Sequence, residues 1–385
     1  MFDDFEDDLQ DDDTAPISLA AAGLLPPRQM KDCLGHESVE RALLEMIEKD
    51  RLPHALIFAG PQGIGKSTMA FRLARYLFKK GKDSNSADGG LFGDSLPKED
   101  VNSLVIDPSE SVFWKVASGG HPDLLTIERL FDDKKSRLKA SVEVDEVRRI
   151  TPFMRMTASQ GGWRIVVVDD ADTMNRSAQN AILKILEEPP PNALLILVCH
   201  RLGAMIPTIR SRCRVIPFSP LSKEDFVSLI RQEHGSLPQS DTDVLFNISG
   251  GSVGQGLRIA DEGGLEAVEK ITALLYGWPR WQWSQIHLLA ESMGRQGQED
   301  KLRAFQDVLL WMVDSLLRAK ARGETPQSPL NNDATQKLLA HYSLPQWIEI
   351  AGQLREHFDT VTAASLDKRH AVIGAFSLFD TKEAA

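Results

Sequence analysis

The segment from Gly60 to Ser67 places two glycines, a lysine and a serine at the spacing G-x-x-x-x-G-K-[ST]. Glycines there let backbone N–H groups face a phosphate, and the N-terminus of the following helix adds a favourable dipole. Lys66 would supply positive charge to the β- and γ-phosphates, and Ser67 would bind Mg²⁺. The alternative is a glycine-rich turn without a ligand. The pattern favours ATP or ADP with Mg²⁺, bound by Gly60, Pro61, Gln62, Gly63, Ile64, Gly65, Lys66, Ser67 and Thr68.

A second candidate feature is a hydrophobic strand that begins at Arg164, continues as Ile-Val-Val-Val and ends in two acids, Asp169 and Asp170. Beside a phosphate-binding loop, Asp169 would join Ser67 as a ligand of Mg²⁺. Asp170 would lie where a carboxylate can orient an attacking water. The alternative is a buried strand that ends in a solvated acidic turn. With the glycine-rich loop in the same chain, the pair favours the nucleotide site.

The elements that must position these residues alternate between strands and helices. Short apolar runs predict buried strands, and apolar residues recurring every three or four positions predict helices. A strand over 54–60 precedes the glycine-rich loop, and a helix over 67–80 follows it. Further strands are expected over 123–130, 161–172 and 192–200, with helices over 36–52, 144–156 and 175–190. This alternation predicts an α/β fold, a parallel sheet with helices on both faces.

Composition divides the chain into segments of different character. Residues 1–27 begin with clustered acids that repel one another, which predicts a disordered arm. Residues 81–120 are rich in Gly, Ser and Asp, which predicts an insertion or long loop inside a nucleotide-binding domain over 28–219. After this domain the pattern is helical, so we expect two helical domains, over 220–270 and 271–380.

The charge is concentrated at one end of the chain. The 385 residues hold 55 acids and 44 bases, a net charge of −11, but eight of the acids lie in the first 13 residues. The rest of the chain is therefore nearly neutral. The three cysteines form no metal-binding spacing, and none lies between residues 79 and 121, so we expect no zinc. The acidic start and the lack of long apolar runs predict a cytoplasmic protein without membrane contact.

Several strings together resemble a known family. They are RLPHALIFAGPQGIGKSTMA, HPDLLTIE, VDEVRRI, IVVVDDADTMNRSAQNAILKILEEPP and PTIRSRC, which all lie between residues 35 and 218. This combination resembles the AAA+ clamp-loader ATPases of bacterial DNA replication, and among them most closely the delta-prime subunits of DNA polymerase III. The glycine-rich loop alone is common to many nucleotide-binding proteins, whereas NAILKILEEPP with TIRSRC is much more specific.

The resemblance implies an AAA+ domain, a helical lid and a helical collar that joins subunits. It implies a hetero-oligomer with delta and gamma/tau subunits, which acts on the sliding clamp and on primed DNA within the DNA-directed DNA polymerase III assembly. Arg212 matches the arginine of the family's Ser-Arg-Cys motif, which is presented to ATP on a neighbouring subunit. Arginine suits this role because its planar charged fork matches phosphate oxygens. The alternative for Arg212 is a surface ion pair.

Three departures from the family pattern bear on catalysis. Gly254 stands where the motor subunits carry a lid arginine that contacts phosphates, and Arg258 lies about one turn further on. Asp170 replaces a glutamate and is one methylene shorter. Cys199-His200 replaces a polar pair, and we expect His200 to be a structural residue. These changes predict weak or absent ATPase activity in this chain. A motor ATPase of gamma/tau type and an unrelated P-loop kinase or other NTPase remain as alternatives.

Two further segments are candidates for a binding role. The segment MKDCLGHE, residues 30–37, is a candidate lining for the adenine pocket. Trp278, Trp281 and Trp283 surround Arg280 and would suit base stacking, although packing between helices or against a neighbouring subunit is the favoured interpretation.

Overall fold

The computed structural model describes residues 25–86, 103–132, 137–159, 162–235, 237–295, 297–326, 328–363 and 367–380. The chain forms two compact units, the first ending at Asp225 and the second beginning at Phe226. The predicted arm lies outside the described residues except for residues 25–27. Among the described residues, no helix is both long enough and apolar enough to span a membrane.

The first unit is built on a parallel five-stranded sheet in the order β2-β5-β6-β1-β7. Its strands are β1 (Ala55–Ala59), β2 (Leu124–Ile127), β5 (Arg164–Val168), β6 (Ala193–Cys199) and β7 (Arg214–Pro217). Every residue of β5 and β6 is buried, which explains why these strands are continuous apolar runs rather than alternating ones. The pattern identified four of the five strands and missed β7, in which Arg214 and Pro217 are exposed.

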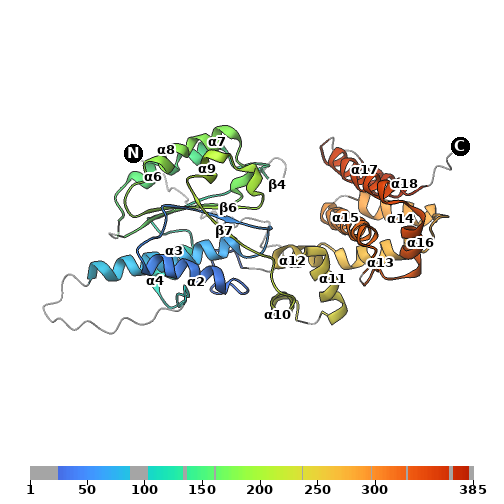
Figure 1. Cartoon of the computed structure of the whole chain (residues 1–385), viewed down its shortest axis with the longest axis horizontal. Coiled ribbons are helices and arrows are strands. Elements are labelled where there is room, and N and C mark those ends of the chain that lie inside the picture. The colour runs from blue at the N-terminus through green and yellow to red at the C-terminus, as the bar shows by residue number, and fades with distance from the viewer. Residues whose placement is uncertain are drawn as a thin grey trace, which may run out of the picture. The chain divides into compact units, whose positions relative to one another are not determined.

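Helices cover both faces of the sheet, as predicted (Figure 1). On one face lie α2 (Glu37–Glu48), α3 (Lys66–Ser86) and α4 (Ser111–Ala117). On the other lie α5 (Val144–Arg148), α6 (Ile150–Arg155), α7 (Arg176–Ala181), α8 (Leu183–Glu187) and α9 (Pro207–Arg210). Alternate side chains of β5 pack on opposite faces of the sheet, with Ile165 and Val167 in one core and Val166 and Val168 in the other. The α/β fold class predicted from the sequence is therefore confirmed.

Three sequence predictions in this unit were partly wrong. The segment 81–120 is not all loop, because α3 continues to Ser86 and α4 buries Phe113 and Val116 one turn apart. The helix expected over 144–156 is divided at Arg149, since the ring of Pro152 disfavours a continuous helix. The helix expected over 175–190 is divided at Ile182. Residues 87–102 lie outside the described part of the chain.

Short elements complete the first unit near the carboxyl ends of the strands. They are the β3 (Phe131–Asp132) and β4 (Arg137–Leu138) pair and two turns of 3₁₀ helix, η2 (Ala171–Thr173) and η3 (Leu202–Ala204). Residues 60, 128–129, 169–170 and 200 follow β1, β2, β5 and β6 directly. In open α/β sheets this edge is where ligands bind.

The second unit is helical, as the sequence predicted. Its helices are α10 (Lys223–Glu233, which begins before the division), α11 (Gln239–Ser249), α12 (Val253–Asp261), α13 (Gly264–Leu275), α14 (Trp283–Gly294), α15 (Glu299–Arg322), α16 (Asp333–His341), α17 (Leu344–Ala363) and α18 (Lys368–Ser377). Helix α15 packs against α13 and α17. The separate lid and collar, with boundaries at 219 and 270, stay predictions.

Two of the three candidate stacking tryptophans are held within the second unit. Trp281 is buried and meets the ring of Phe376 edge-on, with centroids 5.3 Å apart. The ring N–H of Trp278 donates to the carbonyl of Phe379 at 3.4 Å, and its ring packs against His341. Both contacts favour the packing interpretation over base stacking.

Candidate nucleotide-binding site

The glycine-rich loop joins β1 to α3, in the strand, turn and helix context that the motif requires. Two of its glycines are needed for space and geometry. A Cβ at Gly60 would lie 2.4 Å from the carbonyl oxygen of Phe218. Gly65 has φ +101°, and a Cβ there would lie 3.1 Å from Sγ of Cys33. The backbone can therefore take this path only with glycine at both positions.

Lys66 is the buried cation of the loop. Its residue is 2% exposed, and Nζ donates to the carbonyls of Gly60, at 2.8 Å, and Pro61. Burial lowers the pKa of Lys66 to about 8, although Asp169 opposes this shift. Phosphate oxygens are stronger acceptors for an ammonium than carbonyls are, so the lysine is placed to exchange these carbonyls for an anionic ligand.

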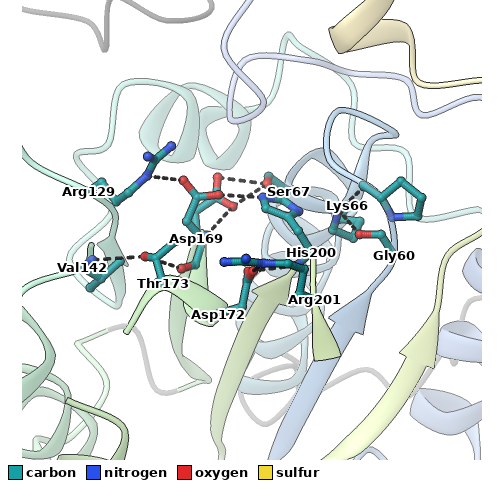
Figure 2. Close-up of polar contacts among 12 residues, drawn as sticks. Gly60, Lys66, Ser67, Arg129, Val142, Asp169, Asp172, Thr173, His200 and Arg201 are labelled. Atoms are coloured by element: carbon teal, nitrogen blue, oxygen red, sulfur yellow. Dashed lines mark hydrogen bonds and ion pairs between the residues drawn. The ribbon is translucent and has the colours of Figure 1, made fainter. Parts of the chain in front are cut away.

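Ser67 and Asp169 meet across the sheet edge. The hydroxyl of Ser67 donates to the Asp169 carboxylate, with both oxygens 3.0 Å away (Figure 2). Burial raises the pKa of Asp169, and the neighbouring charge of Asp170 adds to the rise, although the Ser67 hydrogen bond opposes it. A hydroxyl and an incompletely neutralised carboxylate are a donor set that fits Mg²⁺. These two residues would hold the ion, which would neutralise phosphate charge.

The remaining loop residues differ in exposure. Pro61 and Gln62 are exposed, whereas Ile64 is buried. Thr68 is also buried, and its hydroxyl lies 3.7 Å from Sδ of Met30. The binding role of each residue stays a prediction.

The candidate adenine segment, residues 30–37, packs against the back of the loop. His36 Nε2 lies 2.6 Å from the carbonyl of Ile64, and burial lowers the pKa of this histidine. Cys33 Sγ lies 3.6 Å from the carbonyl of Gly65. These contacts fix the loop, and they leave the segment's role in base binding a prediction.

Asp170 is engaged by two side chains from adjacent strand ends. Arg129 Nε donates to its Oδ2 and His200 Nε2 donates to its Oδ1, each at 2.6 Å (Figure 2). Burial alone would raise the pKa of Asp170, but the His200 hydrogen bond and the Arg129 charge outweigh it, so the pKa lies below its ordinary value. The second acid of the pair therefore has a different environment from the first.

Sequence reasoning missed two residues of this edge. Arg129 was not singled out, although it lies two residues after β2, at the carboxyl end of a parallel strand. Asp172 was also missed. Its side chain is 2% exposed, and it accepts from the backbone N–H of His200 at 2.9 Å and from Arg201 Nε at 3.3 Å. A structural role for His200, as expected, agrees with these contacts.

Arg212 lies away from this network, between α9 and β7. The flanking Ile209 and Cys213 are buried and fix the backbone, while the Arg212 side chain is 36% exposed. Its Nη1 donates to the carbonyl of Thr208 at 3.0 Å, and Nη2 lies 2.9 Å from Oε1 of Glu187. The surface ion pair considered as the alternative for Arg212 is thus present in the free chain.

The sequence of the chain is similar to those of known replication proteins. Residues 35–91 and 96–222 match the family model described as DNA polymerase III, delta subunit. The chain is 30% identical over 229 residues to the DNA polymerase III subunit delta' of Pseudomonas aeruginosa, covering 57% of this chain and 61% of that protein. The Escherichia coli subunit delta' is 27% identical over 245 residues, 63% of this chain and 66% of that protein. Over residues 35–222 the chain is therefore similar to subunits of DNA polymerase III.

The chain is also similar to a protein from outside the bacteria. Replication factor C subunit 5 of Mus musculus is 23% identical over 237 residues, 60% of this chain and 57% of that protein. These alignments span between 57% and 66% of the relatives' own lengths.

The resemblance described above predicts a glycine in place of the lid arginine that motor subunits carry. Gly254 lies in the first turn of α12, which Ser252 caps by accepting from the N–H of Gln255 at 3.2 Å. Arg258, one turn later, pairs with Glu262 at 2.6 Å and Asp307 at 2.5 Å. Both acids belong to the second unit, so the charge of Arg258 is neutralised there.

Proposed function

We propose that this chain is a delta-prime-like subunit of a DNA polymerase III clamp loader. In this role it assembles with delta and gamma/tau subunits and helps to load the sliding clamp onto primed DNA. It binds ATP or ADP with Mg²⁺, hydrolyses ATP slowly or not at all, and supplies Arg212 to the ATP site of a neighbouring subunit. The similarity to subunits of DNA polymerase III supports the assembly and the DNA-loading task.

The proposed nucleotide site is supported by three side chains. Lys66 has carbonyl partners that a phosphate can replace. Ser67 and Asp169 already share a hydrogen bond, so their oxygens are close enough to serve one ion. Ordering these groups before the ligand arrives reduces the entropy that binding must overcome.

Slow hydrolysis is supported by two differences from a motor ATPase. Asp170, in the position of the acid that orients water, has both oxygens engaged by Arg129 and His200. Gly254 cannot contact a phosphate as an arginine would. A poorly positioned water costs about 100-fold in rate for a displacement of roughly 1 Å.

The observation that carries the proposal is the partial exposure of Arg212 and its pairing with a surface acid. Its guanidinium is partly exposed and is paired with an exposed glutamate. Such surface pairs contribute roughly 0 to 1 kcal/mol, so exchanging Glu187 for a phosphate on a partner subunit costs little. The guanidinium also donates a hydrogen bond to the carbonyl of Thr208. An arginine supplied in trans stabilises the charge that spreads over a transferred phosphoryl group.

The test is the DNA- and clamp-stimulated ATPase of the reconstituted loader, with Arg212→Ala and Lys66→Ala introduced separately into this subunit. We expect Arg212→Ala to reduce turnover severely and Lys66→Ala to have a mild effect. Arg210→Ala is the matched control, because Arg210 is an exposed arginine two residues away on α9. If Lys66→Ala abolishes turnover and Arg212→Ala changes nothing, the chain is instead a motor subunit.

A further inference from the structure

Helix α3 carries a buried arginine, Arg75, whose hydrogen bond goes to a backbone carbonyl. Arg75 is 1% exposed, and its Nη2 donates to the carbonyl of Met30 at 2.5 Å. Within the described part of the chain, its Nη1 is buried without a hydrogen-bond partner. Burial lowers the pKa of Arg75 to about 10, and the charge of Arg72 adds to the fall, so the side chain stays charged at neutral pH. A buried charge is costly unless it is fully paired, which indicates a role other than stabilising the fold.

Arg75 connects three parts of the first unit. It belongs to α3, and its guanidinium carbon lies 4.5 Å from the centroid of the Phe113 ring on α4, a cation–π contact. The hydrogen bond to Met30 reaches the third part, the candidate adenine segment. The ring and the carbonyl together determine where the start of this segment lies against α3.

The start of the adenine segment also contacts the first turn of α3. The hydroxyl of Thr68 lies 3.7 Å from Sδ of Met30, the residue whose carbonyl accepts from Arg75. Cys33 and His36 hold the rest of the segment through contacts with carbonyls of the glycine-rich loop. Arg75 therefore fixes the Met30 end of the segment, while other side chains fix the remainder.

The Met30 end is the part of the segment that lies where a nucleoside would begin. A nucleotide whose phosphates occupy the glycine-rich loop must place its ribose and base next to that loop, because they are covalently joined to the phosphates. Thr68 directly follows Ser67, the candidate Mg²⁺ ligand, and Met30 lies beside it. Met30 is only partly buried, and a methionine side chain is flexible, polarizable and well suited to contact a flat ring.

We propose that Arg75 is a positioning residue for the nucleoside side of the nucleotide site, where it holds Met30 beside Thr68 and so sets the affinity for the base and ribose. This inference rests on the proposed nucleotide site. The phosphates depend on other residues, Lys66 and Ser67. The site is thus divided into a phosphate part and a nucleoside part, which different side chains of α3 hold in place.

The experiment compares two ligands on the full chain. Isothermal titration calorimetry measures the dissociation constants of ATP and of tripolyphosphate, both with Mg²⁺, because tripolyphosphate has the phosphates without the nucleoside. The variant is Arg75→Met, which keeps much of the volume but has neither charge nor donor. Replacing a buried charge by an apolar residue of similar size is often neutral for stability. Phe113→Leu removes the ring beneath the guanidinium and serves as the second variant if Arg75→Met does not fold.

We expect Arg75→Met to raise the dissociation constant of ATP about 10-fold, the scale of one hydrogen bond from a charged donor, and to change that of tripolyphosphate by less than about twofold. Phe113→Leu should give a smaller loss with the same selectivity for ATP. A role limited to the stability of the fold would not distinguish the two ligands.

Two controls accompany these variants. Lys66→Met should weaken both ligands, because it removes a charge that the phosphates of each would contact. Leu73→Ala opens a cavity in the core beneath the same helix, two positions from Arg75 and so on another face. It should lower the stability of the protein and leave the ratio of the two dissociation constants unchanged.

The outcomes separate the failure of this inference from that of the proposed function. If Arg75→Met binds ATP as the wild type does, or loses affinity for both ligands equally, Arg75 does not position the nucleoside side. The inference also fails if Leu73→Ala changes the ratio as Arg75→Met does, or if the wild type binds ATP no more tightly than tripolyphosphate. If the wild type binds neither ligand, the proposed nucleotide site is wrong.

Discussion

The carboxyl edge of the sheet, where the candidate nucleotide site lies, and the surface around Arg212 use charged side chains in opposite ways. At the edge, Lys66, Asp169 and Asp170 are largely shielded from water and are satisfied by partners within the chain. Around Arg212, both members of the ion pair are substantially exposed. Buried charges are costly to leave without a partner, whereas an exposed pair exchanges partners cheaply. The contrast is the one expected if the edge holds a ligand and the surface meets another subunit.

The largest effect is expected for substitution of the exposed Arg212. Arg212→Ala should lower the stimulated ATPase of the assembled loader by at least about 100-fold, because a trans arginine contributes roughly 10³- to 10⁵-fold in related phosphoryl transfers. Arg212→Lys should recover little, since lysine lacks the planar fork. Steady-state ATPase assays measure both. A loss below threefold for Arg212→Ala would show that the exposed arginine serves no neighbouring site.

The next prediction concerns the buried Lys66 of the glycine-rich loop. Lys66→Met should weaken binding of an ATP analogue to the isolated chain by about 10- to 100-fold, the loss of one or two charge-assisted hydrogen bonds. Equilibrium titration by fluorescence measures it. Lys49→Met is the control, because Lys49 is an exposed lysine directly after α2. Equal affinity for Lys66→Met and the wild type would mean that the loop binds no phosphate.

The sequence predicted more of the buried edge than of the exposed surface. Residues 60–67 and 164–170 carry local patterns whose strand and helix context follows from apolar periodicity, so the meeting of Ser67 and Asp169 was expected. The contacts of Arg129 and His200 with Asp170 depend on which strands are neighbours, and the order β2-β5-β6 is not written in any local pattern. The strand β7 could not be predicted for the same reason, because it is defined by its pairing with β1 and its own residues do not form an apolar run.

A buried group near the start of β2 predicts a pH effect on stability. His121 is 3% exposed and stacks on Phe78, with ring centroids 3.8 Å apart. Burial lowers its pKa to about 4. The unfolded chain, with an ordinary histidine pKa of about 6.5, binds the extra proton between these values. The stability that neutral His121 provides is therefore complete above pH 6.5 and is lost as the pH falls toward 4.

The size of this effect is measurable against a variant. Between pH 7.5 and pH 5, the wild type should lose about 2 kcal/mol of unfolding free energy relative to His121→Phe, which keeps the ring stack but cannot take up a proton. Urea denaturation of both proteins at the two pH values gives the difference. A constant difference across this range would show that His121 is not buried in its neutral form.

The smallest expected effect returns to the exposed pair. Glu187→Gln removes the partner of Arg212 and should change the free energy of unfolding by less than about 1 kcal/mol, because solvent screens a pair of this exposure. Turnover of the assembled loader should stay within about twofold of the wild type, since the Arg212 charge and its Thr208 hydrogen bond remain. Urea denaturation and ATPase assays test the two statements. If Glu187→Gln matched Arg212→Ala in its loss of turnover, the ion pair itself, rather than an arginine free to change partners, would be the functional unit.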